Sequence, residues 1–321
     1  MAYLEDGDVF LISREGITAD DSVLAPNFEV LEGTYEEQDP GRFEHMMLKE
    51  IFDQPISISN AMSGRISADG MNVELGGFSL SRDDLAKLEK INIVACGSAY
   101  YASLVGVDLL RRFTDISVEA FRASEFPAKS VCNDRTLTIG VSQSGETKDT
   151  LDALQEAKVH GSNISSFCNV IGSTISRLTG NGAYLHAGPE FAVASTKAVT
   201  NMMISFALLS LFLSENNSEK KEIISEMRRL PSRITRQLLE DDGSINRAVD
   251  IIAEANSAIF IGRGISAPLT QEGALKMMEV AYLPCIAYPG GELKHGPIAL
   301  IEEGTPVIAI APKDSSISLM E

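Results

Sequence analysis

The sequence predicts an α/β protein in which helices flank parallel sheets, arranged as two units in tandem. Between residues 91 and 214, short apolar segments alternate with longer helical stretches, an order typical of a parallel sheet with helices on both faces. A second strand, glycine-rich turn and helix follow at residues 258–282 and repeat the layout of residues 91–112. The repeated layout predicts an internal duplication.

Local patterns predict each element. Apolar runs are expected to form strands at residues 91–95, 136–141, 165–170, 183–186, 258–262 and 306–311. Helical periodicity or capping residues predict helices at residues 44–53, 81–90, 99–112, 146–159 and 194–214. A further apolar run, Val9–Ile12, is suited to a buried strand. These elements divide the chain into a connecting segment (1–40), a first α/β domain (41–218), a charged helical connection (219–256) and a partial second domain (257–321).

The second domain is expected to be incomplete. Only the strands at 258–262 and 306–311 are evident in it, and two strands cannot easily bury both faces of a sheet. We therefore expect this domain to be completed by residues absent from the chain.

Composition and charge exclude several classes of partner. A formal net charge of −18 argues against nucleic acid and against an anionic membrane surface. The apolar run 202–213 is too short to span a bilayer, and the amino terminus lacks a signal-peptide pattern, so a cytoplasmic protein is expected. Four widely spaced cysteines without a CxxC pair predict reduced thiols, and neither a metal nor another cofactor is expected: Cys96, Cys132, Cys168 and Cys285.

The strongest local motif lies directly between a predicted strand and a predicted helix. It reads Ser142-Gln143-Ser144-Gly145-Glu146-Thr147. Hydroxyl groups and unpaired backbone N–H groups at a helix amino terminus form an anion cradle, which predicts phosphate binding. The alternative is ordinary capping of the helix, because Ser and Thr are preferred caps. Capping is also the simpler interpretation of a second cluster, Ala194-Ser195-Thr196-Lys197, when that cluster is taken alone.

A charged cluster on a predicted helix has the spacing needed for proton transfer. Glu272, Lys276 and Glu279 fall at positions i, i+4 and i+7, which places them on one helical face. A carboxylate beside an ammonium group can move a proton next to a carbonyl while the ammonium stabilises developing negative charge. A solvated salt-bridge face would have the same spacing.

His295 lies in a loop, Pro289 to Pro297, that is too rich in glycine and proline for regular structure. Such loops often carry functional residues, and histidine titrates near neutral pH. A lone surface histidine is the competing interpretation.

Taken together, the motifs SQSGET, VASTKA, EGALKMME and GELKHGP, in this order, resemble the isomerase half of the glutamine–fructose-6-phosphate aminotransferase family, which has two SIS (sugar isomerase) domains. The resemblance covers nearly the whole chain, and in it residues 3–12 match the last strand of the glutaminase half. It implies a nucleotide-fold-like SIS architecture, a hexose 6-phosphate substrate, amination of fructose 6-phosphate to glucosamine 6-phosphate, and ammonia from a glutaminase half. It also implies a homodimer.

The resemblance implies a role for each matching residue. The sugar phosphate would be held by residues of the first motif: Ser142, Gln143, Ser144 and Thr147. The sugar would be lined by residues of two further turns: Ser98, Val193, Ala194 and Ser195. Glu279 would carry a proton between C1 and C2, Lys276 would stabilise the enolamine-like intermediate, and His295 of the partner subunit would open the ring. Glu272 joins these residues as a candidate catalytic group because it shares their helical face.

The sequence departs from the family at three places. The first turn reads Cys96-Gly97-Ser98-Ala99, where the family often has Cys-Gly-Thr-Ser, so one hydroxyl contact is displaced or lost. The amino terminus lacks the cysteine nucleophile of the glutaminase, and the carboxyl-terminal lysine tail of the family is absent. These departures leave two alternatives: a glutaminase-free SIS isomerase or deaminase acting on another phosphosugar, and a non-catalytic phosphosugar sensor.

Overall fold

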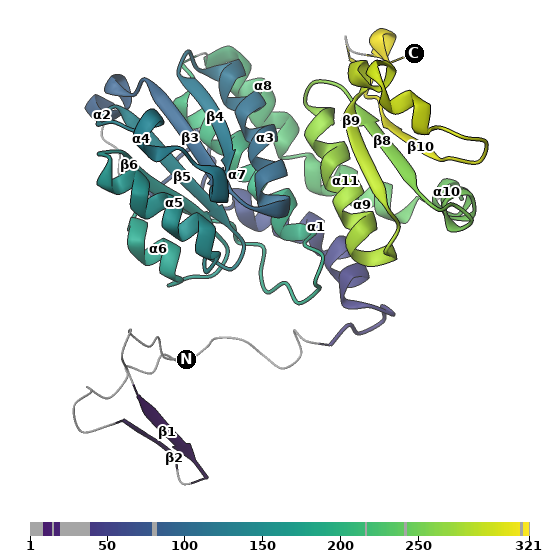
Figure 1. The fold of residues 1–321 in the computed structure, drawn as a ribbon. Coiled ribbons are helices and arrows are strands. Elements are labelled where there is room, and N and C mark those ends of the chain that lie inside the picture. The colour runs from purple at the N-terminus through teal and green to yellow at the C-terminus, as the bar shows by residue number, and fades with distance from the viewer. Residues whose placement is uncertain are drawn as a thin grey trace. The chain divides into compact units, whose positions relative to one another are not determined.

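The computed structural model describes residues 9–14, 16–19, 39–78, 82–215, 217–240, 243–314 and 317–320. The chain forms two compact units, Met1–Glu44 and His45–Glu321 (Figure 1). No helix among these described ranges is long and apolar enough to cross a membrane.

The first unit contains an antiparallel pair of strands, β1 (Phe10–Ser13) and β2 (Gly16–Ala19). The expectation of a buried strand is wrong here, because Leu11 and Ile12 are 68% and 76% exposed. A two-stranded ribbon has no second layer to cover its apolar side chains. Residues 3–8 of the strand expected from the resemblance lie outside the described residues.

The second unit is built on a five-stranded parallel sheet with the order β4-β3-β5-β6-β7. Its strands are β3 (Lys90–Ala95), β4 (Ser117–Arg122), β5 (Thr136–Ser142), β6 (Asn163–Cys168) and β7 (Gly182–Tyr184). The predicted parallel α/β fold is confirmed. β4 was not predicted, because polar and apolar residues are mixed in this edge strand.

Helices cover both faces of this sheet, as the alternation of side chains in β3 requires. Ile91 and Ile93 belong to the core under α1 (Met46–Met62), α3 (Gly97–Phe113) and α7 (Lys197–Leu213). Val94, which points to the other face, packs in a smaller core with residues of α5 (Lys148–Val159) and α6 (Thr174–Thr179). A short helix, α4 (Ala128–Val131), also packs against α5.

Helix α1 extends beyond the predicted helix 44–53 and runs through Pro55. Proline lacks the N–H group that would bond the carbonyl four residues earlier. The side chain of Gln54 supplies the missing donor, because its Nε2 lies 3.0 Å from the carbonyl oxygen of Ile51. The helix expected at 81–90 is the shorter α2 (Arg82–Lys87), and its predicted cap, Ser81, lies outside the described residues.

Three helices follow the first sheet: α8 (Asn217–Met227), α9 (Leu230–Leu239) and α10 (Ser244–Ala253). A second parallel sheet then forms with the order β10-β8-β9. Its strands are β8 (Ala258–Gly262), β9 (Cys285–Pro289) and β10 (Val307–Ile310), and α11 (Ser266–Ala281) packs on them. The sequence analysis missed β9, because its apolar run ends in Pro289 and merges with the Gly- and Pro-rich loop. Short 3₁₀ turns, η3 (Gly290–His295) and η4 (Pro297–Leu300), occupy that loop.

Candidate active site

Ser98 and the Ser142–Thr147 segment lie where the chain reverses direction within the first sheet. From β3 the chain moves to β4 on one side, and then returns to β5 on the other side. Ser98 follows β3, and the Ser142–Thr147 segment follows β5, so both lie at the carboxyl edge of neighbouring strands. In open α/β sheets, ligands bind at this kind of switch point.

Hydroxyl groups shape the turn that follows β5. The Oγ atom of Ser142 lies 2.8 Å from the Oγ1 atom of Thr147 and accepts the N–H of Gly145 at 2.9 Å. Ser144 Oγ accepts the N–H of Glu146 at 3.1 Å. The turn therefore presents hydroxyl groups directly in front of the amino terminus of α5. Gln143 is half-buried beside them, and its backbone carbonyl accepts the N–H of Asn169.

Gly145 makes this turn possible. Its φ is +69°, a conformation that other residues rarely adopt, and a Cβ atom placed on it would lie 2.0 Å from Ser173 Oγ. The neighbouring Glu146 carboxylate accepts the N–H of Thr174 at 2.8 Å, so it is held by the 172–174 loop. The close approach thus locks the turn against that loop.

The turn has the properties of an anion site. Within the described residues, the backbone N–H groups of Ser144, Thr147 and Lys148 donate no hydrogen bond. Lys148 directs its ammonium group to Asp152 on the exposed side of α5. An anion here would therefore be held by N–H and hydroxyl donors at a helix amino terminus, where the helix dipole favours negative charge.

A second turn precedes α7. Ser195 Oγ donates to Glu190 Oε2 at 2.7 Å, while the N–H groups of Thr196 and Ala198 donate to Glu190 Oε1 at 2.9 and 3.1 Å. Glu190 is therefore the cap of this helix. The Ser195 hydroxyl, which was predicted to contact the sugar, therefore already donates its hydrogen bond to this carboxylate. Of the other two predicted residues, Val193 is 97% exposed and Ala194 is buried.

Glu50 of α1 supports this turn from below. Its carboxylate is 1% exposed, and its Oε1 accepts the N–H groups of Phe191 and Ala192 at 2.6 and 3.1 Å. These two residues directly precede Val193. The sequence analysis missed both Glu50 and Glu190. Glu190 lies six residues before the N-cap Thr196, outside the position where capping residues are recognised in a sequence, and no local pattern links Glu50 to a turn 141 residues away.

Helix α11 carries the predicted charged cluster on one face. Lys276 Nζ lies 2.6 Å from Glu279 Oε2 and 3.4 Å from Glu272 Oε1. The side chains of Lys276, Glu272 and Glu279 are 17%, 12% and 32% exposed, so this is not a fully solvated salt-bridge face. Glu279 is the most accessible of the three and is paired with the ammonium group.

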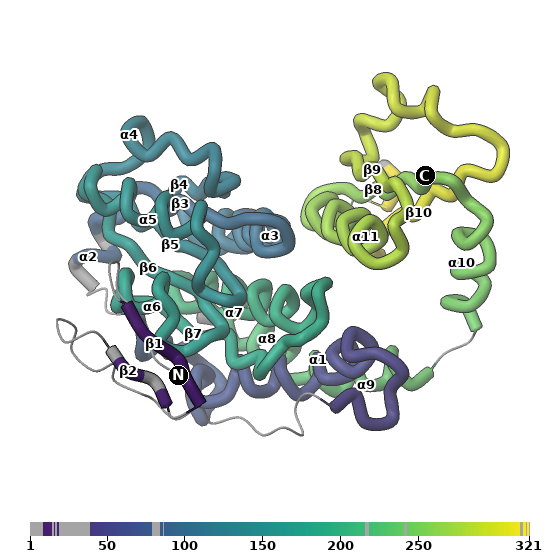
Figure 2. The backbone as a smooth tube through the Cα atoms, turned by 60° about the horizontal axis from the view of Figure 1, so that its bottom comes forward, coloured from purple at the N-terminus to yellow at the C-terminus, as the bar shows by residue number. Residues whose placement is uncertain are grey.

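The α11 cluster lies next to the first turn of the sheet. Helices α11 and α3 pack side by side (Figures 1 and 2). Burial raises the pKa of Glu272, and the ammonium of Lys276 and the hydroxyl of Ser98 oppose that rise. Both carboxylate oxygens of Glu272 are buried, and in the described part of the chain neither accepts a hydrogen bond of standard geometry; the ion pair with Lys276 at 3.4 Å and the nearby Ser98 hydroxyl are the contacts that favour its charged form. Ser98 and α11 are thus brought together, although 174 residues separate Ser98 from Glu272 in the sequence.

His295 is not joined to this cluster within the chain. It ends η3 on the exposed surface, and no contact to the α11 charges is found among the described residues. The ranges described also hold no group of three or more histidine, cysteine or acidic side chains able to bind a metal ion. All four cysteines are free thiols, and burial raises the pKa of Cys168 to about 11.

Comparison with known proteins places this architecture. The sequence model of the SIS domain family matches residues 84–211 and 251–321. The curated glutamine–fructose-6-phosphate aminotransferase (isomerizing) of Caldanaerobacter subterraneus subsp. tengcongensis is 40% identical over 328 aligned positions, which cover 99% of this chain and 54% of that protein. The enzyme of the same name from Chlorobaculum tepidum is 39% identical, with 98% of this chain and 53% of that protein covered. The chain therefore spans about half the length of these relatives.

A solved structure agrees with the sequence relatives. The C-terminal domain of glucosamine-fructose-6-phosphate aminotransferase from Francisella tularensis superposes with a TM-score of 0.81 at 30% identity. The superposition covers 88% of this chain and 80% of that one.

Proposed function

This chain belongs to the SIS domain family, and on that premise we propose that it is the sugar-phosphate isomerase part of a glutamine–fructose-6-phosphate aminotransferase. Its reaction would convert fructose 6-phosphate and ammonia to glucosamine 6-phosphate. The ammonia would come from a glutaminase half, as the names of the curated relatives imply for those proteins.

One observation carries the proposal: the packing of α11 against α3 brings Glu272 beside Ser98. The acidic and basic side chains of α11, which packs on the second sheet, therefore lie next to the switch point of the five-stranded sheet. The turn that follows β5 at this switch point is the anion cradle, residues 142–147. A phosphosugar needs both features, because its phosphate must be anchored while a proton moves at its opposite end.

The cradle would bind the phosphate through Ser142, Ser144 and Thr147, with Gln143 beside them. Neutral donors at a helix amino terminus suit this task in a protein of net charge −18, because they bind an anion without a surplus of basic residues. Ser98 and the segment Val193–Ser195 would line the sugar.

The α11 cluster would carry out the isomerisation. Ammonia adds to the C2 carbonyl and water leaves, which gives an imine. Glu279, the most accessible carboxylate, would take a proton from C1 and return one to C2, so that C1 becomes the aldehyde carbon. Lys276, held 2.6 Å from Glu279, would stabilise negative charge on the enolamine-like intermediate. The buried Glu272 would hold Lys276 in place.

We also propose the organisation in which this chemistry works. Residues 41–218 would form the first SIS domain, 219–256 the helical connection and 257–321 part of the second SIS domain; residues 1–40 would end the glutaminase half and link to it. Support comes from the two separate parallel sheets. The exposed position of His295 is compatible with a homodimer in which this residue reaches the site of the partner subunit.

The direct test uses the chain of 321 residues in two steps. Thermal shift should show stabilisation by fructose 6-phosphate and by glucosamine 6-phosphate. Incubation with ammonium and fructose 6-phosphate should then exchange solvent protons into C1 or C2, and glucosamine 6-phosphate should accumulate. Binding without exchange would favour a non-catalytic sensor, and exchange confined to another phosphosugar would favour a different SIS isomerase or deaminase.

A further inference from the structure

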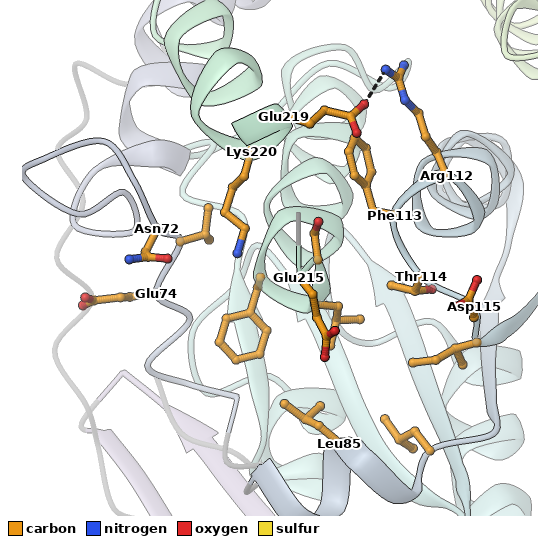
Figure 3. A pocket seen from close by; sticks show the side chains of 16 residues that line it. Asn72, Glu74, Leu85, Arg112, Phe113, Thr114, Asp115, Glu215, Glu219 and Lys220 are labelled. Atoms are coloured by element: carbon orange, nitrogen blue, oxygen red, sulfur yellow. Dashed lines mark hydrogen bonds and ion pairs between the residues drawn. The ribbon is translucent and has the colours of Figure 1, made fainter. Parts of the chain in front are cut away.

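A pocket lies at the amino edge of the five-stranded sheet, opposite the edge that carries the candidate active site. It has a volume of about 1040 Å³ and opens where α3 and α7 end and α8 begins (Figure 3). Its wall includes Phe113 at the end of α3, Ile116 just after it, and Phe212 and Leu213 at the end of α7. Because helices α3 and α7 each run the length of the sheet, this pocket is separated from the candidate active site by the body of the domain.

Lys220 is the unusual group in this pocket. Its side chain descends from α8 and points its amine into the space, as Figure 3 shows. The residue is only 6% exposed, yet its Nζ makes no hydrogen bond or ion pair with any described residue. Burial lowers the pKa of Lys220, with no neighbouring charge to oppose it. The stem of Lys220 is covered by its neighbours, and its ammonium group faces the pocket without a counter-charge, so an anion that enters the pocket can pair with it.

The carboxylates around the pocket do not supply that counter-charge. Glu219 is turned away from Lys220 and pairs with Arg112 at 2.8 Å (Figure 3). Glu74, Asp115 and Glu215 line the same pocket, but all three are exposed. They form an acidic rim in contact with solvent, while the amine of Lys220 points into the pocket.

We propose that this pocket binds a small organic anion with an apolar body. A carboxylate or phosphate group of the ligand pairs with Lys220, and the apolar part rests against Phe113 and Phe212. Hydroxyl or amino groups of the ligand donate to the acidic rim. An inorganic anion alone is disfavoured, because it would meet the rim carboxylates without gaining apolar contact. Since the site lies at the far edge of the domain, it is independent of the proposed phosphosugar chemistry.

The test uses anilinonaphthalene sulfonate, a fluorescent dye that combines an anionic group with aromatic rings. The unmodified chain, Lys220→Met and Lys221→Met are titrated side by side. Lys221 is the matched control, because it is the exposed neighbour on the same helix. We expect one saturable binding phase that weakens at least about tenfold in Lys220→Met and changes less than about twofold in Lys221→Met. Equal titrations for all three proteins would overturn the proposal.

Three further measurements complete the test. Lys220→Met should keep or raise the melting temperature, because methionine keeps the covered apolar stem and no described residue pairs with the ammonium that is lost; a large decrease would assign Lys220 a structural role instead and contradict the proposal. Hexanoate should displace the dye from this phase more effectively than inorganic phosphate, and the reverse order would refute the apolar requirement. The double variant Ser144→Ala/Thr147→Ala should bind the dye normally, because its changes lie at the other edge; loss of the phase there would show that the dye occupies the phosphosugar site.

Discussion

The ammonium group of Lys276 bridges two carboxylates of α11, at 2.6 Å from Glu279 and 3.4 Å from Glu272. The two acids differ in environment: Glu272 is 12% exposed and Glu279 is 32% exposed. A shared ammonium between a buried and an accessible carboxylate suits a division of labour, in which one acid orients the lysine and the other meets the substrate.

The first prediction assigns the proton transfer to Glu279. Glu279→Gln keeps the shape of the side chain and removes the base, so solvent-proton exchange at C1 or C2 of bound fructose 6-phosphate should fall at least about 100-fold. Thermal stabilisation by the sugar phosphate should change little, because binding relies on the cradle. Exchange that persists in the variant would show that another group is the base.

The second prediction concerns pH and Glu272. Its pKa is raised in the folded chain by burial, so the folded state holds this proton at a pH where the unfolded chain, with a carboxyl pKa of about 4.3, has lost it. This group therefore reduces stability as the pH rises through that window. We therefore compare the free energy of unfolding of Glu272→Gln with that of the unmodified chain. The difference should favour the variant more at pH 7.5 than at pH 5.

Urea midpoints at the two pH values measure this effect. Glu125→Gln, a change at an exposed residue, is the control and should leave the pH dependence unchanged. If Glu272→Gln raises the urea midpoint over that of the unmodified chain more at pH 5 than at pH 7.5, the prediction is contradicted.

The third prediction tests the phosphate cradle. Ser144→Ala together with Thr147→Ala removes hydroxyl donors and should weaken fructose 6-phosphate binding by roughly 1–3 kcal/mol. Calorimetry measures the affinity, and Ser130→Ala, on the exposed side of α4, is the control. Unchanged affinity in the double variant would place the phosphate elsewhere.

The sequence predicts the fold well where side-chain periodicity matches burial. In β3, Ile91 and Ile93 enter one core and Val94 enters the other, as expected for a strand covered on both faces. The run is interrupted only by Asn92, which is buried and donates from its side-chain amide to the carbonyl oxygen of Val131 at 3.2 Å. Two edge strands were not predicted, because β4 is only half-buried and β9 ends in proline, whereas the edge strands β7 and β10 were predicted from their apolar runs.

The candidate site is only partly visible in the sequence, for a related reason. The turn at Ser142–Thr147 and the helical face of Glu272 and Glu279 depend on near neighbours, which a linear pattern can reveal. Glu50 depends on tertiary packing, because α1 must lie beneath a turn that is distant in the sequence before its carboxylate can accept those N–H groups. The unpaired position of Lys220 likewise follows only from packing.

The fourth prediction follows from Glu50. Glu50→Ala leaves the N–H groups of Phe191 and Ala192 without an acceptor, each at a cost of about 1–3 kcal/mol if it stays buried. Amide hydrogen exchange across residues 190–196 should accelerate, while exchange in β5 should stay slow. Glu50→Gln keeps an accepting oxygen and should retain most of the protection. Unaltered exchange at residues 190–196 in Glu50→Ala would show that the carboxylate does not hold this turn.

The last prediction separates backbone strain from close packing at the cradle. Gly145 and Gly180 both have positive φ, +69° and +56°, but only Gly145 is crowded, since Ser173 Oγ would lie 2.0 Å from its added Cβ. Gly180→Ala should therefore cost only the conformational strain, about 1–2 kcal/mol, and leave phosphosugar affinity unchanged. Gly145→Ala should cost more in stability and should also weaken affinity, because the turn must move away from the 172–174 loop. Adding Ser173→Gly removes the obstructing side chain and should restore part of both losses. If the two alanine variants behave alike in urea unfolding and in calorimetry, the close contact between Gly145 and Ser173 does not position the cradle.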